Sequence, residues 1–185
     1  NQMQNQAAAW WIPYAGIGYG PTLGDTYSFR SAYCSGMTVR TWEHADPEWE
    51  VGASGEPMEW ARRYFAEYNA VRKYFSADYY PLIPFSRENG TWCASEYYDP
   101  EQYSGVILAF RRAACPYDEV TVRLSGLHPH RRYTLTDADT GASFTASGSS
   151  DERKARTNAA VRRSSPGSRG TISSAACQAS RKRSA

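Results

Sequence analysis

The pattern of apolar and polar residues changes its period near residue 78. Before that point apolar residues recur at three- and four-residue spacing, which is typical of one face of an α-helix. Pro57 suits the first turn of that helix, because the N–H that proline lacks has no partner there. The pattern therefore predicts a long helix that begins at Pro57. The recurring apolar residues are Met58, Ala61, Phe65, Tyr68, Val71 and Phe75.

After residue 78 the apolar residues alternate with polar ones, as in a sheet with one solvated face. Val120, Val122 and Leu124 show this most clearly. Turn-forming pairs such as Asn89-Gly90 and Thr140-Gly141 separate the segments. We expect a small antiparallel β-sandwich. Its predicted strands are residues 79–85, 91–97, 105–111, 119–124, 132–136 and 142–147.

The first part of the chain has the order strand, loop, helix, strand, loop, helix. Ala7–Tyr14 is an apolar run suited to a strand buried on both faces, residues 25–32 predict a short helix capped by Asp25 or Thr26, and residues 37–42 predict a second strand. This order fits the last two βα units of a (β/α)₈ TIM-type barrel. Because two units cannot close a barrel, we expect a fragment of a larger protein.

Taken together, the periods predict an α/β region followed by an all-β region. Residues 1–77 are assigned to the end of a catalytic (β/α)₈ barrel and residues 78–148 to an antiparallel β-sandwich. Residues 149–185 are assigned to a disordered tail. Composition also marks the start of the tail, since no Phe, Tyr or Trp occurs after Phe144.

The tail is also strongly basic. From Asp151 onward it carries nine Lys and Arg against two acids, whereas the whole chain has a net charge of only +2. A segment of this kind buries too little apolar surface to offset its ordering entropy. It has two interpretations: a tail that contacts nucleic-acid phosphates, or the product of a shifted reading frame near Ser149 in GC-rich DNA. The acidic body disfavours nucleic acid as a partner, and we prefer the frameshift.

Composition excludes a membrane protein. The mean hydropathy is −0.66, and the 185 residues contain no apolar run of the roughly 18 residues that a membrane helix needs. The first residues lack the pattern of a signal peptide, but the localisation stays open. The four cysteines are expected to be buried reduced thiols, with a Cys93–Cys115 bridge left open.

Several segments resemble the C-terminal part of family 36 glycoside hydrolases, the melibiase-type α-galactosidases. They are Trp11–Gly20 (WIPYAGIGYG), Asp25–Ala32 (DTYSFRSA) and Asp78–Ser86 (DYYPLIPFS), with further echoes in residues 108–112, 115–117, 124–129 and 133–141. The resemblance covers about residues 3–148. In that family the barrel ends with segments of this kind, a long helix and a C-terminal β-sandwich.

The resemblance implies a retaining hydrolase of terminal α-galactosides or related oligosaccharides. One Asp would attack the anomeric carbon and a second would protonate the leaving oxygen, with the carboxylates roughly 5 Å apart. In the family both lie on earlier barrel strands, so no catalytic residue is assigned to this chain, and we expect the isolated chain to be inactive. No cofactor or metal is expected, and a homo-oligomer is left open.

The candidate substrate-binding residues are Trp10, Tyr14 and Trp42. Their flat rings suit a pyranose, and they belong to two predicted strands whose carboxyl ends would lie at a barrel's active face. For each single residue, including Trp11, packing inside the barrel is the favoured interpretation.

Other polar clusters are expected to be structural. The acids between Glu43 and Glu50 lie on a loop bounded by Gly and Pro and suit a solvated surface. Arg30 is expected to form an ion pair with an acidic neighbour rather than to clamp substrate. His128 and His130 flank Pro129 without further metal ligands at suitable spacing, so we expect exposed turn residues. The alternative function is a non-catalytic carbohydrate-binding β-sandwich protein.

Overall fold

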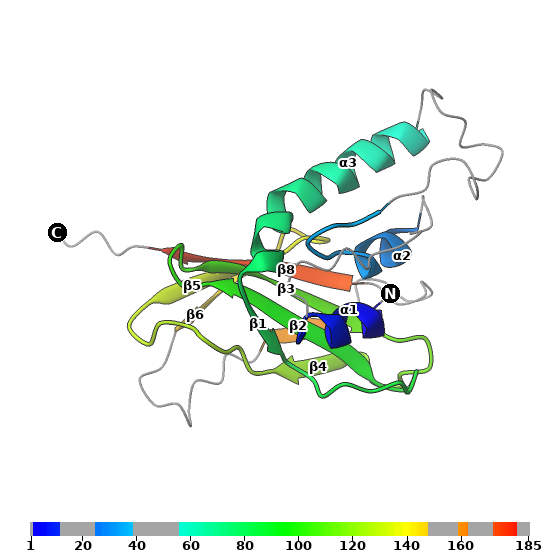
Figure 1. Cartoon of the computed structure of the whole chain (residues 1–185). Helices are drawn as coiled ribbons and strands as arrows, with labels where there is room; N and C mark the ends of the chain where they lie inside the picture. Colours follow the sequence, from blue (N-terminus) through cyan, green and yellow to red (C-terminus); the bar gives the residue numbers. More distant parts are fainter. Residues whose placement is uncertain (1, 12–24, 39–55, 148–158, 163–171, 181–185) are drawn as a thin grey trace. The chain divides into compact units, whose positions relative to one another are not determined.

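The computed structural model describes residues 2–11, 25–38, 56–147, 159–162 and 172–180 (Figure 1). The chain divides into two compact units, Asn1–Ser76 and Ala77–Ala185. The division falls beside the junction at which the sequence period changes. Within the described residues, no helix has the length and apolar character needed to cross a bilayer.

The described part of the first unit is helical. It contains α1 (Gln2–Ala8), α2 (Thr26–Ser31), α3 (Glu56–Val71) and a 3₁₀ turn, η1 (Arg72–Ser76). Asp25 caps α2, since its Oδ1 accepts hydrogen bonds from the backbone N–H groups of Tyr27 and Ser28. The predicted short helix with an Asp25 cap and the predicted long helix are both confirmed.

Aromatic rings form the core of this unit. Phe29 of α2 is completely buried, and its ring lies 5.2–6.2 Å from the rings of Trp60, Tyr64 and Phe65 on α3. Tyr68 packs against Tyr33, with ring centroids 5.3 Å apart. The apolar stripe predicted for α3 therefore faces α2, and Tyr64 belongs to it as well.

The strand predicted at residues 7–14 is wrong for the part that the structure describes. Gln2–Ala8 is the helix α1, and residues 9–11 form a turn. Ala, Gln and Met favour helices, and no β-branched residue occurs between residues 2 and 11. The side-chain amides of Gln2 and Asn5 donate to the Ser31 hydroxyl and the Ser31 carbonyl, so polar contacts hold α1 against the end of α2.

The second predicted barrel strand, residues 37–42, lies almost wholly outside the described residues. Thr38 forms an isolated bridge, and nothing beyond it is described until residue 56. The described part of the first unit therefore shows helices but no (β/α)₈ barrel.

In the second unit, all six predicted strands are present. They are β1 (Asp78–Pro81), β2 (Trp92–Asp99), β3 (Ser104–Arg111), β4 (Glu119–Val122), β5 (Arg132–Asp137) and β6 (Ser143–Ser147). Every pairing is antiparallel. The larger sheet has the order β1-β2-β3-β8-β5-β6, and β4 pairs with β7 in a second sheet.

The two sheets share one apolar cluster. Val122 of β4 packs in it with Tyr98 of β2 and Ile107 of β3, and its full membership is Trp92, Ala94, Tyr98, Ile107, Ala109, Cys115, Val122, Leu124, Tyr133 and Leu135. Val122 and Leu124 are buried while Thr121 and Arg123 are exposed, so the alternation predicted for this strand is confirmed.

Two segments within the predicted tail are strands in the structure. Ala159–Arg162 is β7, and Ile172–Ser180 is β8, which lies between β3 and β5 in the larger sheet. The antiparallel unit therefore does not end at residue 148. The average composition of the tail conceals eleven consecutive uncharged residues, 170–180, between Arg169 and Arg181. Strand pairing uses the backbone, so it does not require large side chains.

Three cysteines behave as predicted. Cys34, Cys93 and Cys115 are buried and form no disulfide with one another, so the bridge between the last two is absent.

Candidate functional site

The three predicted sugar-binding residues fall unevenly on the structure. Trp10 lies in the turn after α1 with its side chain 62% exposed. Tyr14 and Trp42 lie outside the described residues, as do the acids of the loop from Glu43 to Glu50. Their grouping around one sugar is therefore untested.

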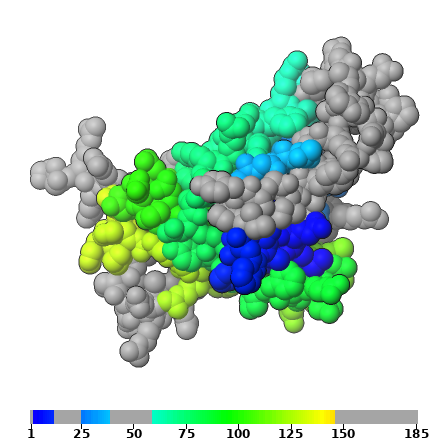
Figure 2. All heavy atoms as spheres, in the orientation of Figure 1, coloured from blue at the N-terminus to red at the C-terminus, as the bar shows by residue number. Residues whose placement is uncertain are grey.

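Trp11 is the second exposed aromatic of this turn. It is 86% exposed among the described residues, and its expected packing inside a barrel stays a prediction. Residues 2–11 form part of the surface on the face shown in Figure 2 (dark blue). Two adjacent exposed indoles give flat apolar faces of the kind on which a sugar ring can stack.

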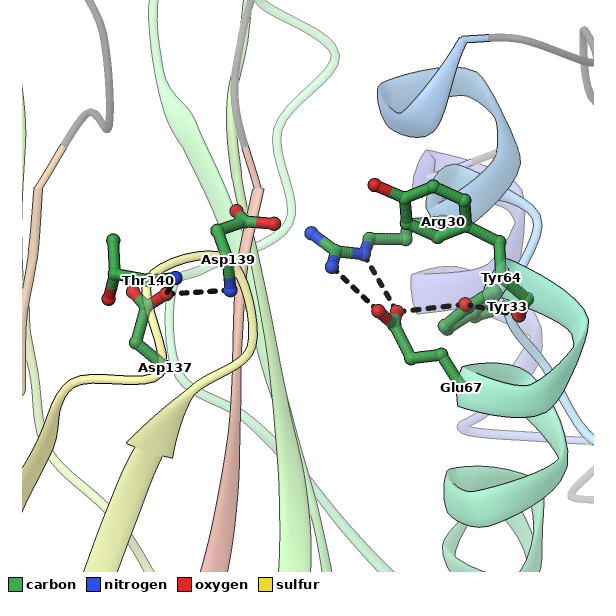
Figure 3. A network of polar contacts seen from close by, with 7 residues as sticks. All are labelled: Arg30, Tyr33, Tyr64, Glu67, Asp137, Asp139 and Thr140. Carbon is green, nitrogen blue, oxygen red and sulfur yellow. Dashed lines mark hydrogen bonds and ion pairs between the residues drawn. The ribbon is translucent and has the colours of Figure 1, made fainter. Parts of the chain in front are cut away.

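A buried ion pair joins α2 to α3 (Figure 3). Both nitrogens of the fork, Nε and Nη2 of Arg30, donate to the two carboxylate oxygens of Glu67 at 2.7 Å. Arg30 is completely buried, and Glu67 has 18% of its side chain exposed. A buried guanidinium requires a partner of this kind, because an unpaired charge in the core is very costly. The predicted ion pair of Arg30 is confirmed.

Tyrosines complete this network. The Tyr33 hydroxyl is 2.9 Å from Glu67 Oε1 and 3.3 Å from the Tyr64 carbonyl oxygen, and the Arg30 guanidinium lies 5.4 Å from the centre of the Tyr64 ring. Burial raises the pKa of Tyr33, and the negative charge of Glu67 raises it further. The tyrosine therefore stays a neutral donor, and both Glu67 oxygens are engaged. This arrangement suits structural support rather than acid–base catalysis.

Glu96 is the second buried carboxyl group, and it belongs to β2. It is 2% exposed, and its Oε2 accepts a hydrogen bond of 2.8 Å from the Ser125 backbone N–H. Burial raises the pKa of Glu96 to about 8, although the Ser125 hydrogen bond acts in the opposite direction. A carboxyl group whose pKa lies near neutrality can act as a general acid. Glu96, however, is closed off from solvent, so substrate has no access to it.

A chain of hydroxyl groups lies in the same unit. The Tyr98 and Tyr133 hydroxyls are 2.8 Å apart, and the Tyr133 hydroxyl accepts a hydrogen bond of 2.8 Å from the His128 backbone N–H. Both tyrosines are buried, and His128 is exposed as predicted. The loop between β4 and β5 is thereby fixed to the core beneath it.

Asp137 organises the turn between β5 and β6. Its Oδ1 accepts hydrogen bonds from the backbone N–H groups of Asp139 and Thr140, at 2.8 and 2.9 Å (Figure 3). Such a turn is a common local structure of Asp. Within the described residues, no group of three or more His, Cys, Asp or Glu side chains is arranged to hold a metal ion.

The similarity of this chain to known proteins is found in structure and not in sequence. No family model matches the sequence, and no curated protein matches it. Solved structures do match. The GH36 α-galactosidase AgaA from Geobacillus stearothermophilus superposes with a TM-score of 0.56 over 83% of this chain, at 16% sequence identity. This chain shares its fold with part of a GH36 α-galactosidase.

Two further structures agree with this likeness. The GH36 α-galactosidase AgaB from the same organism matches with a TM-score of 0.52 at 16% identity, and a variant of AgaA in complex with stachyose matches with 0.55 at 17%. Both cover 83% of this chain and 19% of the solved chain. The chain thus spans about a fifth of the proteins that it matches. The resemblance stated from the sequence is confirmed at the level of fold.

Sequence reasoning missed Glu67, Tyr33 and Glu96. Glu67 lies outside the apolar stripe predicted for α3, and spacing alone does not show that a buried arginine lies opposite it. Glu96 occurs between Ser95 and Tyr97 in a strand that is buried from Trp92 to Tyr98. A single acid within such an apolar and aromatic segment was the available signal.

Proposed function

We propose that this chain is the C-terminal part of a retaining glycoside hydrolase that cleaves terminal α-galactosides. The observation that carries the proposal is the fold match with GH36 α-galactosidases over 83% of the chain. Structures in this group include complexes of AgaA variants with raffinose and stachyose. We extend to this chain the substrate class that those complexes indicate, an oligosaccharide ending in α-galactose.

On this proposal residues 1–77 complete a (β/α)₈ barrel, and the antiparallel unit supports it without taking part in chemistry. The buried acids of the described residues favour this division. Glu67 is held by Arg30, and Glu96 is enclosed beside Ser125. A retaining mechanism needs two carboxyl groups that face one substrate-accessible space. We therefore place the nucleophile and the acid/base on residues outside this chain.

The test is to sequence the coding DNA upstream of Asn1 and to express the longer product. We expect earlier barrel strands with two aspartates at their ends, and hydrolysis of an aryl α-galactoside that releases the α-anomer first. The 185-residue chain alone should give no turnover. Turnover by the chain alone, or a longer product without two such aspartates, would contradict the proposal.

A second candidate is a non-catalytic sugar-binding protein, favoured by the exposed pair Trp10 and Trp11. Quenching of tryptophan fluorescence by raffinose should saturate in the native chain, and W10A and W11A should each weaken binding. Y117A is the matched control, because Tyr117 is 69% exposed but belongs to the second unit. Loss of binding in all three variants, or in none, would count against these indoles as a sugar-binding surface.

A further inference from the structure

One surface cluster is not used by the proposed function. It consists of Tyr103, from the turn between β2 and β3, and of His128, His130 and Arg131, from the loop between β4 and β5. We name it the Tyr103 cluster. The His128 ring meets the Tyr103 ring edge to face at 5.8 Å, and the His130 ring lies 5.9 Å from that of His128. Two loops thus bring His128 and Arg131 against the Tyr103 ring, with His130 beside His128.

The guanidinium of Arg131 is held in a defined position. Its Cζ lies 3.5 Å from the centre of the Tyr103 ring, which is close stacking for a cation on an aromatic face. The ring covers one face of the planar group. The N–H groups at its edge point within the plane, where a planar guanidinium binds oxygen anions in a bidentate manner.

The backbone on both sides fixes this arrangement. Tyr103 has φ = 52°, a left-handed conformation that is costly for a residue other than glycine. On the other loop, the His128 N–H donates to the buried Tyr133 hydroxyl, and the Arg131 N–H donates to the His128 carbonyl at 3.2 Å. The cluster is therefore built on the core rather than on a freely moving loop.

No acid neutralises the cluster in the part of the chain that the structure describes. The ion pairs found there for other arginines are Arg30 with Glu67 and Arg111 with Asp118, and no carboxylate pairs with Arg131, His128 or His130. The sequence contains no Asp or Glu between Glu119 and Asp137. Asp99, in the neighbouring turn, uses Oδ1 to accept the Glu101 and Gln102 backbone N–H groups.

We propose that the Tyr103 cluster binds an oxyanion, the phosphate or carboxylate group of a small ligand. Arg131 supplies the bidentate contact, Tyr103 orients it, and the imidazoles of His128 and His130 offer ring N–H donors beside it. This proposal does not rest on the proposed hydrolase function, because a neutral galactoside offers no charge for such a site. It assigns the second unit a binding role of its own.

The experiment is a calorimetric titration of the native chain at constant ionic strength, in mildly acidic buffer. The probes are inorganic phosphate, galacturonate and, as an uncharged sugar, galactose. We expect saturable binding of at least one anion and none of galactose. Preference for phosphate or for galacturonate would identify the source of the oxyanion. An absence of saturable anion binding would overturn the proposal.

Variants locate the site. R131Q should weaken anion binding by about tenfold or more, and R131K, which keeps the charge but loses the planar fork, should recover only part of it. R132Q is the matched control, since Arg132 is an exposed neighbour on β5. An equal loss in R131Q and R132Q would show nonspecific attraction to positive charge. Native affinity in R131Q, with an unchanged melting temperature, would also contradict the proposal.

Discussion

The two units bury an acid in opposite ways. In the helical unit, Glu67 lies against the guanidinium of the fully buried Arg30 and accepts two hydrogen bonds of 2.7 Å from it. In the sheet unit, no cation among the described residues lies beside Glu96, which is held by one backbone N–H. The first unit therefore contains a buried charged pair, whereas the second contains a buried neutral acid. Of these two acids, Glu67 is therefore stabilised by a charged partner and Glu96 by a bound proton.

The largest expected effect on stability comes from breaking the Arg30–Glu67 ion pair. R30M should destabilise the chain by about 3–4 kcal/mol, because it leaves the Glu67 carboxylate in the core without its partner. The double variant R30M/E67L should recover much of this loss, since it removes both charges. The measurement is urea denaturation followed by fluorescence.

R63M is the matched control for this pair. Arg63 is an exposed residue of α3 whose guanidinium lies 5.5 Å from the Tyr64 ring centre, and the described structure gives it no ion pair. We expect a change of less than about 1 kcal/mol. If R30M were no more destabilised than R63M, the Arg30–Glu67 pair would not be what stabilises the helical unit.

The second largest effect concerns the close approach of two backbones in the sheet unit. A Cβ on residue 105 would overlap the carbonyl oxygen of Tyr97 on the neighbouring strand. G105A should therefore cost about 2–3 kcal/mol through displacement of β2 from β3. G90A is the control, since the nearest atom to its Cβ would be the Ala114 oxygen at 3.8 Å. Equal stabilities of the two variants would show that β2 and β3 separate easily.

The third effect concerns the proton that Glu96 keeps in the folded chain. The pKa of Glu96 is raised from 4.5 to about 8, so the folded chain keeps a proton that the unfolded chain releases. Stability should be full below about pH 4.5 and should fall as the pH rises to 8, by up to about 1.4 kcal/mol per pH unit. E96Q should remove this slope.

At pH 8, E96Q should be more stable than the native chain by about 2 kcal/mol, because the amide needs no proton but leaves its NH₂ group without a partner. Urea denaturation at a series of pH values measures this. E101Q is the control, since Glu101 is exposed. A native slope that persisted in E96Q would assign the pH dependence to other groups.

The smallest expected effect concerns two Asp side chains, Asp25 and Asp137, that accept hydrogen bonds from nearby backbone N–H groups. Asp25 caps α2 and Asp137 organises the β5–β6 turn, and in each the Oδ1 atom accepts two backbone N–H groups. D25A and D137A should each cost about 1 kcal/mol, and the matched Asn variants should lose only part of that. Thermal melting of the four variants checks this. Asn variants as unstable as the Ala variants would mean that the charge matters more than the hydrogen bonds.

Periodicity predicted most of the elements, because it reports local burial directly. The stripe on α3 and the six strands from β1 to β6 depend on which side chains face a core, and that information lies in neighbouring residues. The helix α1 was missed because the apolar run from Ala7 was given more weight than the helix-forming residues before it. The strand β8 was missed because its small uncharged residues lie within a basic segment, and strand pairing depends on partners far away in sequence.

The candidate site was less predictable than the fold. Arg30 could be expected to have an acidic partner, but the identity of Glu67 depends on how α2 and α3 pack. The raised pKa of Glu96 depends on the depth of burial, and the Tyr103 cluster depends on two loops meeting. Each of these depends on contacts between segments far apart in the sequence, which no periodic pattern reveals.

The central place of β8 has a consequence for how the sheet is assembled during synthesis. The ribosome makes β1, β2, β3, β5 and β6 before it makes Ile172–Ser180, yet β3 and β5 meet only through that segment. Until it emerges, the nascent chain carries two half-sheets, each with an open inner edge that can pair with a neighbouring chain. Among the described strands of this sheet, the one translated last therefore joins the two halves, and a holdase chaperone would be needed most just before that strand emerges.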